Sequence, residues 1–156
     1  MGYYFNGILT SIEAWDAYKG KYYNICAIEL YPNIIAIPIS DDFYDEINKE
    51  QITKVQTKVQ DYEYLTGALK QLCSDFSKIA RTAYIEAEYF GGVGTQNAIV
   101  WEASNIIFEE TLSGNAINKA LQQLCVTRTD DRDEFDTVQL GRHRSNERWL
   151  KEEKHV

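Results

Sequence analysis

The stretch EYFGGVGTQNAIVW, residues Glu88–Trp101, places three glycines within four positions directly after an alternating run. Glycines of this kind occur in phosphate-binding loops and in tight connections between strands. A phosphate loop needs a helix after it, because the anion binds free N–H groups at the positive end of the helix dipole. Here Ala98–Trp101 is apolar, and its β-branched and aromatic side chains favour a buried strand. The stretch matches neither a Walker loop nor G-x-G-x-x-G, so we predict a β-hairpin and no bound cofactor.

Segments on both sides extend this hairpin into an antiparallel sheet. Residues 82–90 alternate between two faces, which is typical of a half-exposed strand. Near the N-terminus, Tyr31-Pro32-Asn33 is a turn sequence between two runs of β-branched and aromatic residues, and it predicts a second hairpin. The expected strands span residues 3–9, 22–30, 33–39, 82–90, 98–101 and 106–108.

Helical periodicity appears between the two groups of strands and again after them. Ser40 precedes four closely spaced acidic residues, which suits an N-cap and the positive end of a helix. Apolar residues at steps of three and four between residues 52 and 79 predict one long helix, or two helices with a break near Gln60 or Gly67. A last helix is expected after Ser113-Gly114-Asn115.

The size of the chain bounds its organisation. A length of 156 residues is usual for one domain, and 44% hydrophobic residues can supply its core. We predict a single globular domain over residues 1–156. Its fold class is α+β, with an antiparallel sheet of five or six strands and two or three helices packed on one face.

The charge of the chain is strongly acidic and unevenly distributed. The formal net charge is −8. Residues 1–139 hold 11 basic and 21 acidic side chains, a net charge of −10, whereas residues 140–156 have a net charge of +2. A field of this sign repels nucleic acid and anionic membranes and attracts basic proteins. The sequence therefore predicts a basic protein partner, although an acidic surface also serves solubility alone.

The cysteines indicate a reducing compartment. Cys26, Cys73 and Cys125 lie in apolar runs and form no C-x-x-C pair. No secretory hydrophobic region follows Met1, and no apolar run approaches the roughly 20 residues that cross a bilayer. We predict a cytoplasmic protein with three reduced thiols, at least two of them buried, and with no metal cluster.

Acidic side chains in two segments are the candidates for a partner-binding surface. Glu86 and Glu88 point to the same face of one expected strand, where a metal or acid–base role is geometrically feasible and a solvated face is the simpler reading. Asp130, Asp131 and Asp133 belong to a charged run that lacks the sixth-position glycine of an EF-hand. We predict that these five carboxylates face a basic partner and bind no metal.

Catalytic signatures are scarce in the sequence. Neither G-x-S-x-G nor H-E-x-x-H occurs, and His155 lies next to the C-terminus. We therefore predict that the protein is not an enzyme. The alternative is a small enzyme or nucleotide-binding regulator that uses the Gly91–Gly94 loop with Arg142, His143 and Arg144. A structural or adaptor protein is a third class.

Three segments together resemble a group of small bacterial proteins encoded beside polymorphic toxin genes. The segments are the hairpin YFGGVGTQ at Tyr89–Gln96, the helix INKAL at Ile117–Leu121, and the tail with DEFD at Asp133–Asp136, LGRHR at Leu140–Arg144 and Trp149. The resemblance implies an immunity protein of contact-dependent growth inhibition or a related secretion system. Such a protein is an antitoxin that binds and neutralises a cognate toxin domain by stoichiometric occlusion. The acidic charge independently suits a nuclease toxin, because a nuclease has a cationic cleft.

Overall fold

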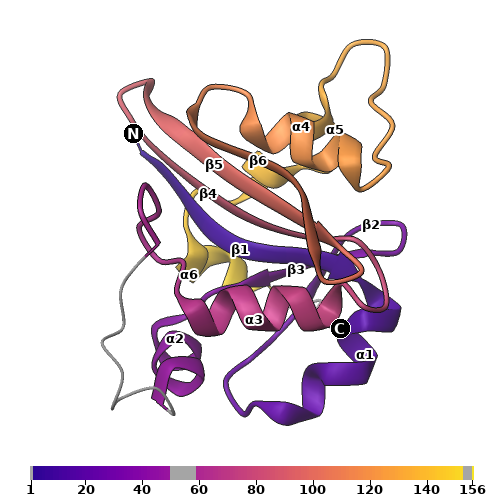
Figure 1. Cartoon of the computed structure of the whole chain (residues 1–156). Helices are drawn as coiled ribbons and strands as arrows, with labels where there is room; N and C mark the ends of the chain where they lie inside the picture. The colour runs from indigo at the N-terminus through magenta and orange to yellow at the C-terminus, as the bar shows by residue number, and fades with distance from the viewer. Residues whose placement is uncertain (1, 50–58, 153–155) are drawn as a thin grey trace.

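A computed structural model describes residues 2–49, 59–152 and 156 of the chain. Six strands form one antiparallel sheet in the order β2-β3-β1-β4-β5-β6 (Figure 1). The strands are β1 (Tyr3–Ser11), β2 (Ile28–Tyr31), β3 (Ile34–Pro38), β4 (Thr82–Phe90), β5 (Val93–Glu102) and β6 (Asn105–Ser113). The predicted α+β class and antiparallel sheet are confirmed.

Helices cover both faces of the sheet (Figure 1). On one face lie α1 (Ile12–Tyr18), α2 (Asp41–Asn48) and α3 (Gly67–Phe76), and the short turn η1 (Lys19–Lys21) follows α1. The other face is covered by α4 (Ala116–Gln123), α5 (Glu134–Thr137), η3 (Leu140–Arg142) and α6 (Asn146–Leu150). Three helices thus lie on one face, as expected, and the structure adds a second helical layer on the opposite face. The helices after α4 are too short to show an apolar period, so the sequence did not reveal them.

Each face of the sheet therefore has its own core. Phe5 and Trp149 are buried on the α4 face, where their rings meet edge to face at 5.8 Å. Phe43, Leu69 and Phe76 are buried on the α3 face. The expectation that residues 82–90 form a half-exposed strand is wrong, because both faces of this central strand are covered and its first six residues are buried.

Side-chain caps begin the helices of the α3 face. Ser40 Oγ accepts the N–H of Phe43 at 3.0 Å, and Thr66 Oγ1 accepts the N–H of Leu69 at 3.3 Å. The predicted helical region is thus divided, and its second helix begins at Gly67, one of the two expected break positions. Residues 50–58 of that prediction lie outside the described residues.

Backbone geometry explains each of the three glycines in the stretch Glu88–Trp101. Gly91 and Gly92 form the turn between β4 and β5 with φ of +60° and +81°, values that glycine adopts without steric cost. A Cβ on Gly94 would clash with the carbonyl of Glu88 on the paired strand. The predicted hairpin is confirmed, and the residue after the turn begins a strand.

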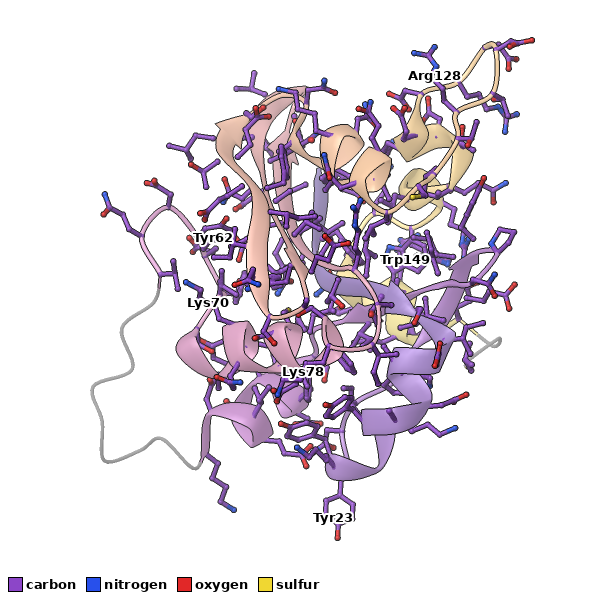
Figure 2. The ribbon with its side chains drawn as sticks, turned by 45° about the vertical axis from the view of Figure 1, so that its right-hand side comes forward. Tyr23, Tyr62, Lys70, Lys78, Arg128 and Trp149 are labelled. Atoms are coloured by element: carbon purple, nitrogen blue, oxygen red, sulfur yellow. The ribbon has the colours of Figure 1, made fainter. Side chains whose placement is uncertain are left out.

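The C-terminal segment is held to the sheet by a buried amide and a buried indole. Asn146 Oδ1 accepts the N–H of Asn6 at 3.0 Å, and Asn146 Nδ2 donates to the carbonyls of Asn6 and Ile39, each at 2.9 Å. Trp149 lies inside the molecule, whereas Tyr23 projects into solvent (Figure 2). The far end of the chain is thereby attached to β1.

The thiols occupy three different environments. Cys73 is buried, Cys26 is half-buried and Cys125 is exposed, and all three are free. Burial raises the pKa of the Cys73 thiol well above its usual value. The prediction that at least two are buried is wrong, because Cys125 follows α4 at a turn with φ of +66° instead of continuing the apolar face of the helix. In the described part of the chain, no helix has the length and apolar character to cross a bilayer.

Candidate functional site

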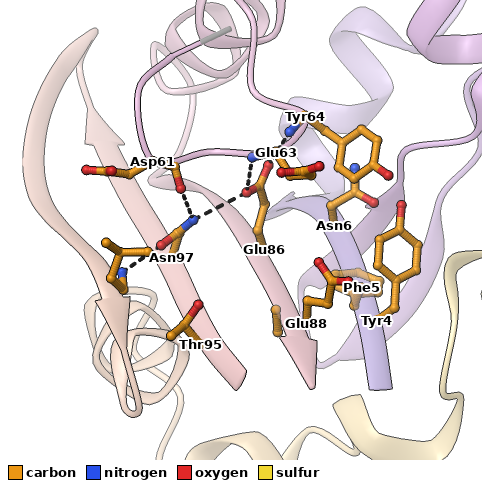
Figure 3. A pocket seen from close by; sticks show the side chains of 12 residues that line it. Tyr4, Phe5, Asn6, Asp61, Glu63, Tyr64, Glu86, Glu88, Thr95 and Asn97 are labelled. Atoms are coloured by element: carbon orange, nitrogen blue, oxygen red, sulfur yellow. Dashed lines mark hydrogen bonds between the residues drawn. The ribbon is translucent and has the colours of Figure 1, made fainter. Parts of the chain in front are cut away.

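A pocket of about 170 Å³ opens on the α3 face of the sheet (Figure 3). Its floor comes from the strands β1, β4 and β5, and one wall comes from the segment that precedes α3. The polar and aromatic residues that line it are Tyr4, Phe5, Asn6, Asp61, Glu63, Tyr64, Glu86, Glu88, Thr95 and Asn97. Leu112 of β6 closes one side.

Glu86 holds the wall of the pocket to its floor. Its Oε1 accepts the N–H of Glu63 and its Oε2 accepts the N–H of Tyr64, both at 2.8 Å. The hydroxyl of Tyr84 donates to Oε2 at 2.6 Å, and Asn97 Nδ2 approaches Oε1 at 3.4 Å. With a relative exposure of 6%, Glu86 is a buried carboxylate satisfied by neutral donors.

Asn97 extends this network to the neighbouring elements. Its Nδ2 donates to the carbonyl of Asp61 at 2.7 Å, and its Oδ1 accepts the N–H of Leu112 at 2.8 Å. One buried amide thus joins β5 to the wall segment and to β6 (Figure 3). The side chains at the bottom of the pocket are fixed before any ligand arrives.

Tyrosine rings form the aromatic side of the pocket. Tyr4 and Tyr64 meet edge to face at 5.9 Å, and Tyr44 contacts Tyr64 at 6.2 Å. Burial, a hydrogen bond with Tyr64 and the nearby charges of Asp41 and Glu86 raise the pKa of Tyr4 well above its usual value. Burial and the charge of Glu86 also raise the pKa of Tyr84. The Tyr4 and Tyr84 phenols therefore remain neutral at physiological pH.

The pocket has a one-sided charge. Asp61, Glu63, Glu86 and Glu88 line it, and its lining includes no Lys, Arg or His. Within the described residues, none of these four carboxylates forms an ion pair. Carboxylates beside tyrosine rings bind ammonium and guanidinium groups through charge-assisted hydrogen bonds and cation–π contact. The described residues contain no group of three or more His, Cys, Asp or Glu side chains that could hold a metal ion.

The structure separates the predicted acidic residues into different roles. Glu88 is exposed and lines the pocket, whereas Glu86 is buried, so its expected exposure is wrong. The segment before α3 folds over Glu86 and donates two backbone N–H groups to it. No local pattern around residue 86 indicates that long-range contact.

The aspartates after α4 lie on the other side of the sheet. Asp130 and Asp131 are exposed at a turn. Asp133 caps α5, because its Oδ1 accepts the N–H of Asp136 at 2.8 Å and its Oδ2 accepts Asn118 Nδ2 at 3.1 Å. Since α4 and α5 pack on the face opposite α3, the five carboxylates do not form one surface (Figure 1).

Two of the three basic residues of the alternative site are engaged elsewhere. Arg142 Nη2 contacts Glu152 Oε1 at 2.9 Å and its guanidinium lies 4.5 Å from the centre of the Trp149 ring. His143 Nε2 lies 2.9 Å from Glu152 Oε2. Arg144 lines a different pocket, which also includes Asp133. The Gly91–Gly92 turn leads into a strand, so it lacks the helix N-terminus of a phosphate loop.

Sequence reasoning missed most of the pocket. Tyr4, Tyr64 and Asn97 were not candidates, and neither was Glu63. A usable signal was present in Asp61-Tyr62-Glu63-Tyr64, where acidic and aromatic residues alternate outside any strand. Comparison of the chain with protein-family models, with curated proteins and with solved structures finds no match.

Proposed function

We propose that the protein is an immunity protein that binds and neutralises a cognate nuclease toxin domain in the cytoplasm by stoichiometric occlusion. The observation that carries the proposal is the acidic, tyrosine-walled pocket whose lining has no basic side chain. A nuclease binds phosphates with Lys and Arg side chains. An antitoxin that accepts one of those side chains competes directly with the nucleic acid.

The pocket suits a single Lys or Arg side chain of such a partner. Glu88 at the mouth is exposed and available to the incoming cation. Glu86 is already oriented by its hydrogen bonds, so binding need not order it. Tyr4 and Tyr64 offer aromatic surface to the same cation. The overall charge of −8 would further accelerate encounter with a basic protein.

The test is an inhibition assay with the protein domain encoded by the adjacent reading frame. We expect that domain to cleave nucleic acid, and we expect an equimolar amount of the present protein to abolish cleavage. Glu88→Lys should weaken inhibition, whereas Asp130→Lys, the same charge change on the other side of the sheet, should not. Undiminished cleavage in the presence of a molar excess would rule out the immunity function.

The adaptor reading predicts a different result in the same experiment. A structural or adaptor protein with this pocket would bind a basic partner without abolishing any enzymatic activity of that partner. Binding measured by calorimetry together with full retention of cleavage would therefore assign the protein to the adaptor class.

A further inference from the structure

β6 forms an open edge of the sheet, in contrast to β2 at the other edge. The carbonyl of Glu29 in β2 accepts Arg142 Nη2 at 3.4 Å, and the carbonyl of Ala27 beside it accepts the N–H of Val156 at 2.8 Å. β6 spans nine residues, and β2 spans four. Within the described chain, residues 105–113 make no backbone–backbone hydrogen bond outside the sheet ladder. β6 thus offers free backbone groups along its outer side.

The ladder indicates which backbone groups of β6 point outward. Ile39 donates its N–H to the carbonyl of Asn6, so Asn6 and alternate residues of β1 direct their backbone groups towards β3. The strand registers carry this alternation across β4 and β5. Phe108 and Glu110 then face β5, and the N–H and C=O of Glu109 point away from the sheet.

β6 lacks two of the residues that most often protect sheet edges. Its sequence, NIIFEETLS, contains neither Lys nor Pro, and its charged residues are the glutamates Glu109 and Glu110. Ile106, Ile107 and Leu112 are exposed to 48%, 39% and 60%. Register shifts interrupt the ladder near both ends of the strand, so the regular part is centred on Phe108–Glu110. A partner strand would pair along that central part.

We propose that β6 binds an extended segment of a basic partner protein by strand addition. The partner is the one invoked under Proposed function, so this inference rests on that function. Glu109 at the centre of β6 accepts the hydroxyl of Tyr62 at 2.9 Å and has no cationic partner among the described residues. Leu112 lies both on β6 and in the lining of the acidic pocket. A strand on β6 would therefore carry neighbouring Lys or Arg side chains towards the pocket.

A second copy of the chain suits this edge less well. Two copies each carry a net charge of −8. A symmetric antiparallel pair centred on Glu109 would set that carboxylate opposite its own copy, which is destabilising. Charge complementarity instead favours a basic strand.

The experiment is an NMR titration of the ¹⁵N-labelled protein with the capped peptide acetyl-Lys-Val-Lys-Val-Thr-Val-Lys-amide. We expect amide shifts in β6 and slower hydrogen exchange at Glu109, because its outward N–H gains an acceptor. The same peptide with Glu in place of every Lys should not bind. Glu109→Pro removes the outward N–H and should weaken binding about fivefold or more. Glu109→Gln keeps that N–H but removes the charge. It should therefore bind the peptide more weakly than the parent protein at low salt and as well as the parent protein at high salt.

Each outcome of the titration decides the proposal. Absence of binding, or shifts confined to pocket residues such as Glu88 and Asn97 with β6 unaffected, would overturn strand addition. Equal binding by Glu109→Pro and Glu109→Gln, with both variants folded by their NMR spectra, would also overturn it. A dimer detected by light scattering and lost in Glu109→Pro would show that a second copy occupies β6. The nuclease inhibition assay fails or succeeds independently of these results, so failure of the proposed function remains distinguishable.

Discussion

Two acidic regions that look equivalent in the sequence have different structural roles on opposite sides of the sheet. At the pocket, Glu86 is buried under the segment before α3 and holds that segment in place, while Glu88 remains exposed at the mouth. After α4, Asp130 and Asp131 lie in solvent and Asp133 caps a helix. A carboxylate therefore contributes to stability, to binding or to neither according to its hydrogen-bond donors. Charge count alone does not separate these cases.

The largest expected effect is on stability at Glu86. Glu86→Leu leaves the N–H groups of Glu63 and Tyr64 and the hydroxyl of Tyr84 without their acceptor. Because each unsatisfied buried group costs about 1–3 kcal/mol, we expect the free energy of unfolding to fall by about 3 kcal/mol or more. Equilibrium unfolding in urea measures the change.

A matched variant separates the hydrogen bonds from the charge. Glu86→Gln keeps one acceptor oxygen and the shape of the side chain, so it should destabilise less than Glu86→Leu. If Glu86→Leu matched the parent protein in urea, Glu86 would not hold the pocket wall, and the contrast between the two acidic regions would disappear.

A smaller loss of stability is expected at Asp133. Asp133→Ala removes the acceptor for the N–H of Asp136 at the start of α5, and loss of an N-cap costs about 1 kcal/mol. Asp133→Asn retains a capping oxygen and serves as the control. In thermal unfolding, Asp133→Ala should have a lower melting temperature than Asp133→Asn. The reverse order would show that repulsion among the acidic residues of this segment outweighs the cap.

Local signals predicted the hairpins and helix starts, because their causes lie within a few residues. Gly91 and Gly92 supply the positive φ angles of one turn, and Ser40 caps the helix that follows it. The burial of Glu86 depends on donors 22 and 23 positions away along the chain. A period-two pattern shows which side chains share a face but not which segment later covers that face.

The C-terminal segment was unpredictable for a related reason. Residues 127–152 contain only short helices, and their attachment depends on single side chains rather than on an apolar stripe. Trp149 fills the core of the α4 face. The Asn146 amide accepts the backbone N–H of Asn6 in β1 and donates to the carbonyl of Ile39, which follows β3. Both contacts reach residues near the N-terminus, 107 or more positions away in the case of Asn146. Trp149 anchors this segment in the core of the α4 face, and the face that it covers could not be inferred from the sequence.

The exposed carboxylate of the pocket should affect association and leave stability unchanged. Glu88→Lys reverses a charge at the mouth of the pocket without breaking a hydrogen bond of the buried network. The free energy of unfolding should therefore change by less than about 0.5 kcal/mol. Its association with a basic partner should be slower at low salt and closer to the parent rate at high salt. Stopped-flow kinetics with the proposed partner, the domain encoded by the adjacent reading frame, provides the measurement. An unchanged rate at low salt would remove Glu88 from the interface.

The smallest effect is expected at Asp131, and it defines the boundary of the proposed binding surface. Asp131 is exposed at a turn near α5, which packs on the face of the sheet opposite the pocket. Asp131→Lys makes the same change in net charge as Glu88→Lys, so the long-range part of the electrostatic attraction weakens equally in both variants. At an ionic strength of about 0.15 M the Debye length is about 8 Å, and only charges near the partner then affect the association rate. At that ionic strength we expect Asp131→Lys to associate at the parent rate and Glu88→Lys to associate more slowly. If Asp131→Lys slowed association as much as Glu88→Lys did, the partner would respond to net charge alone, and the pocket would not be its binding site.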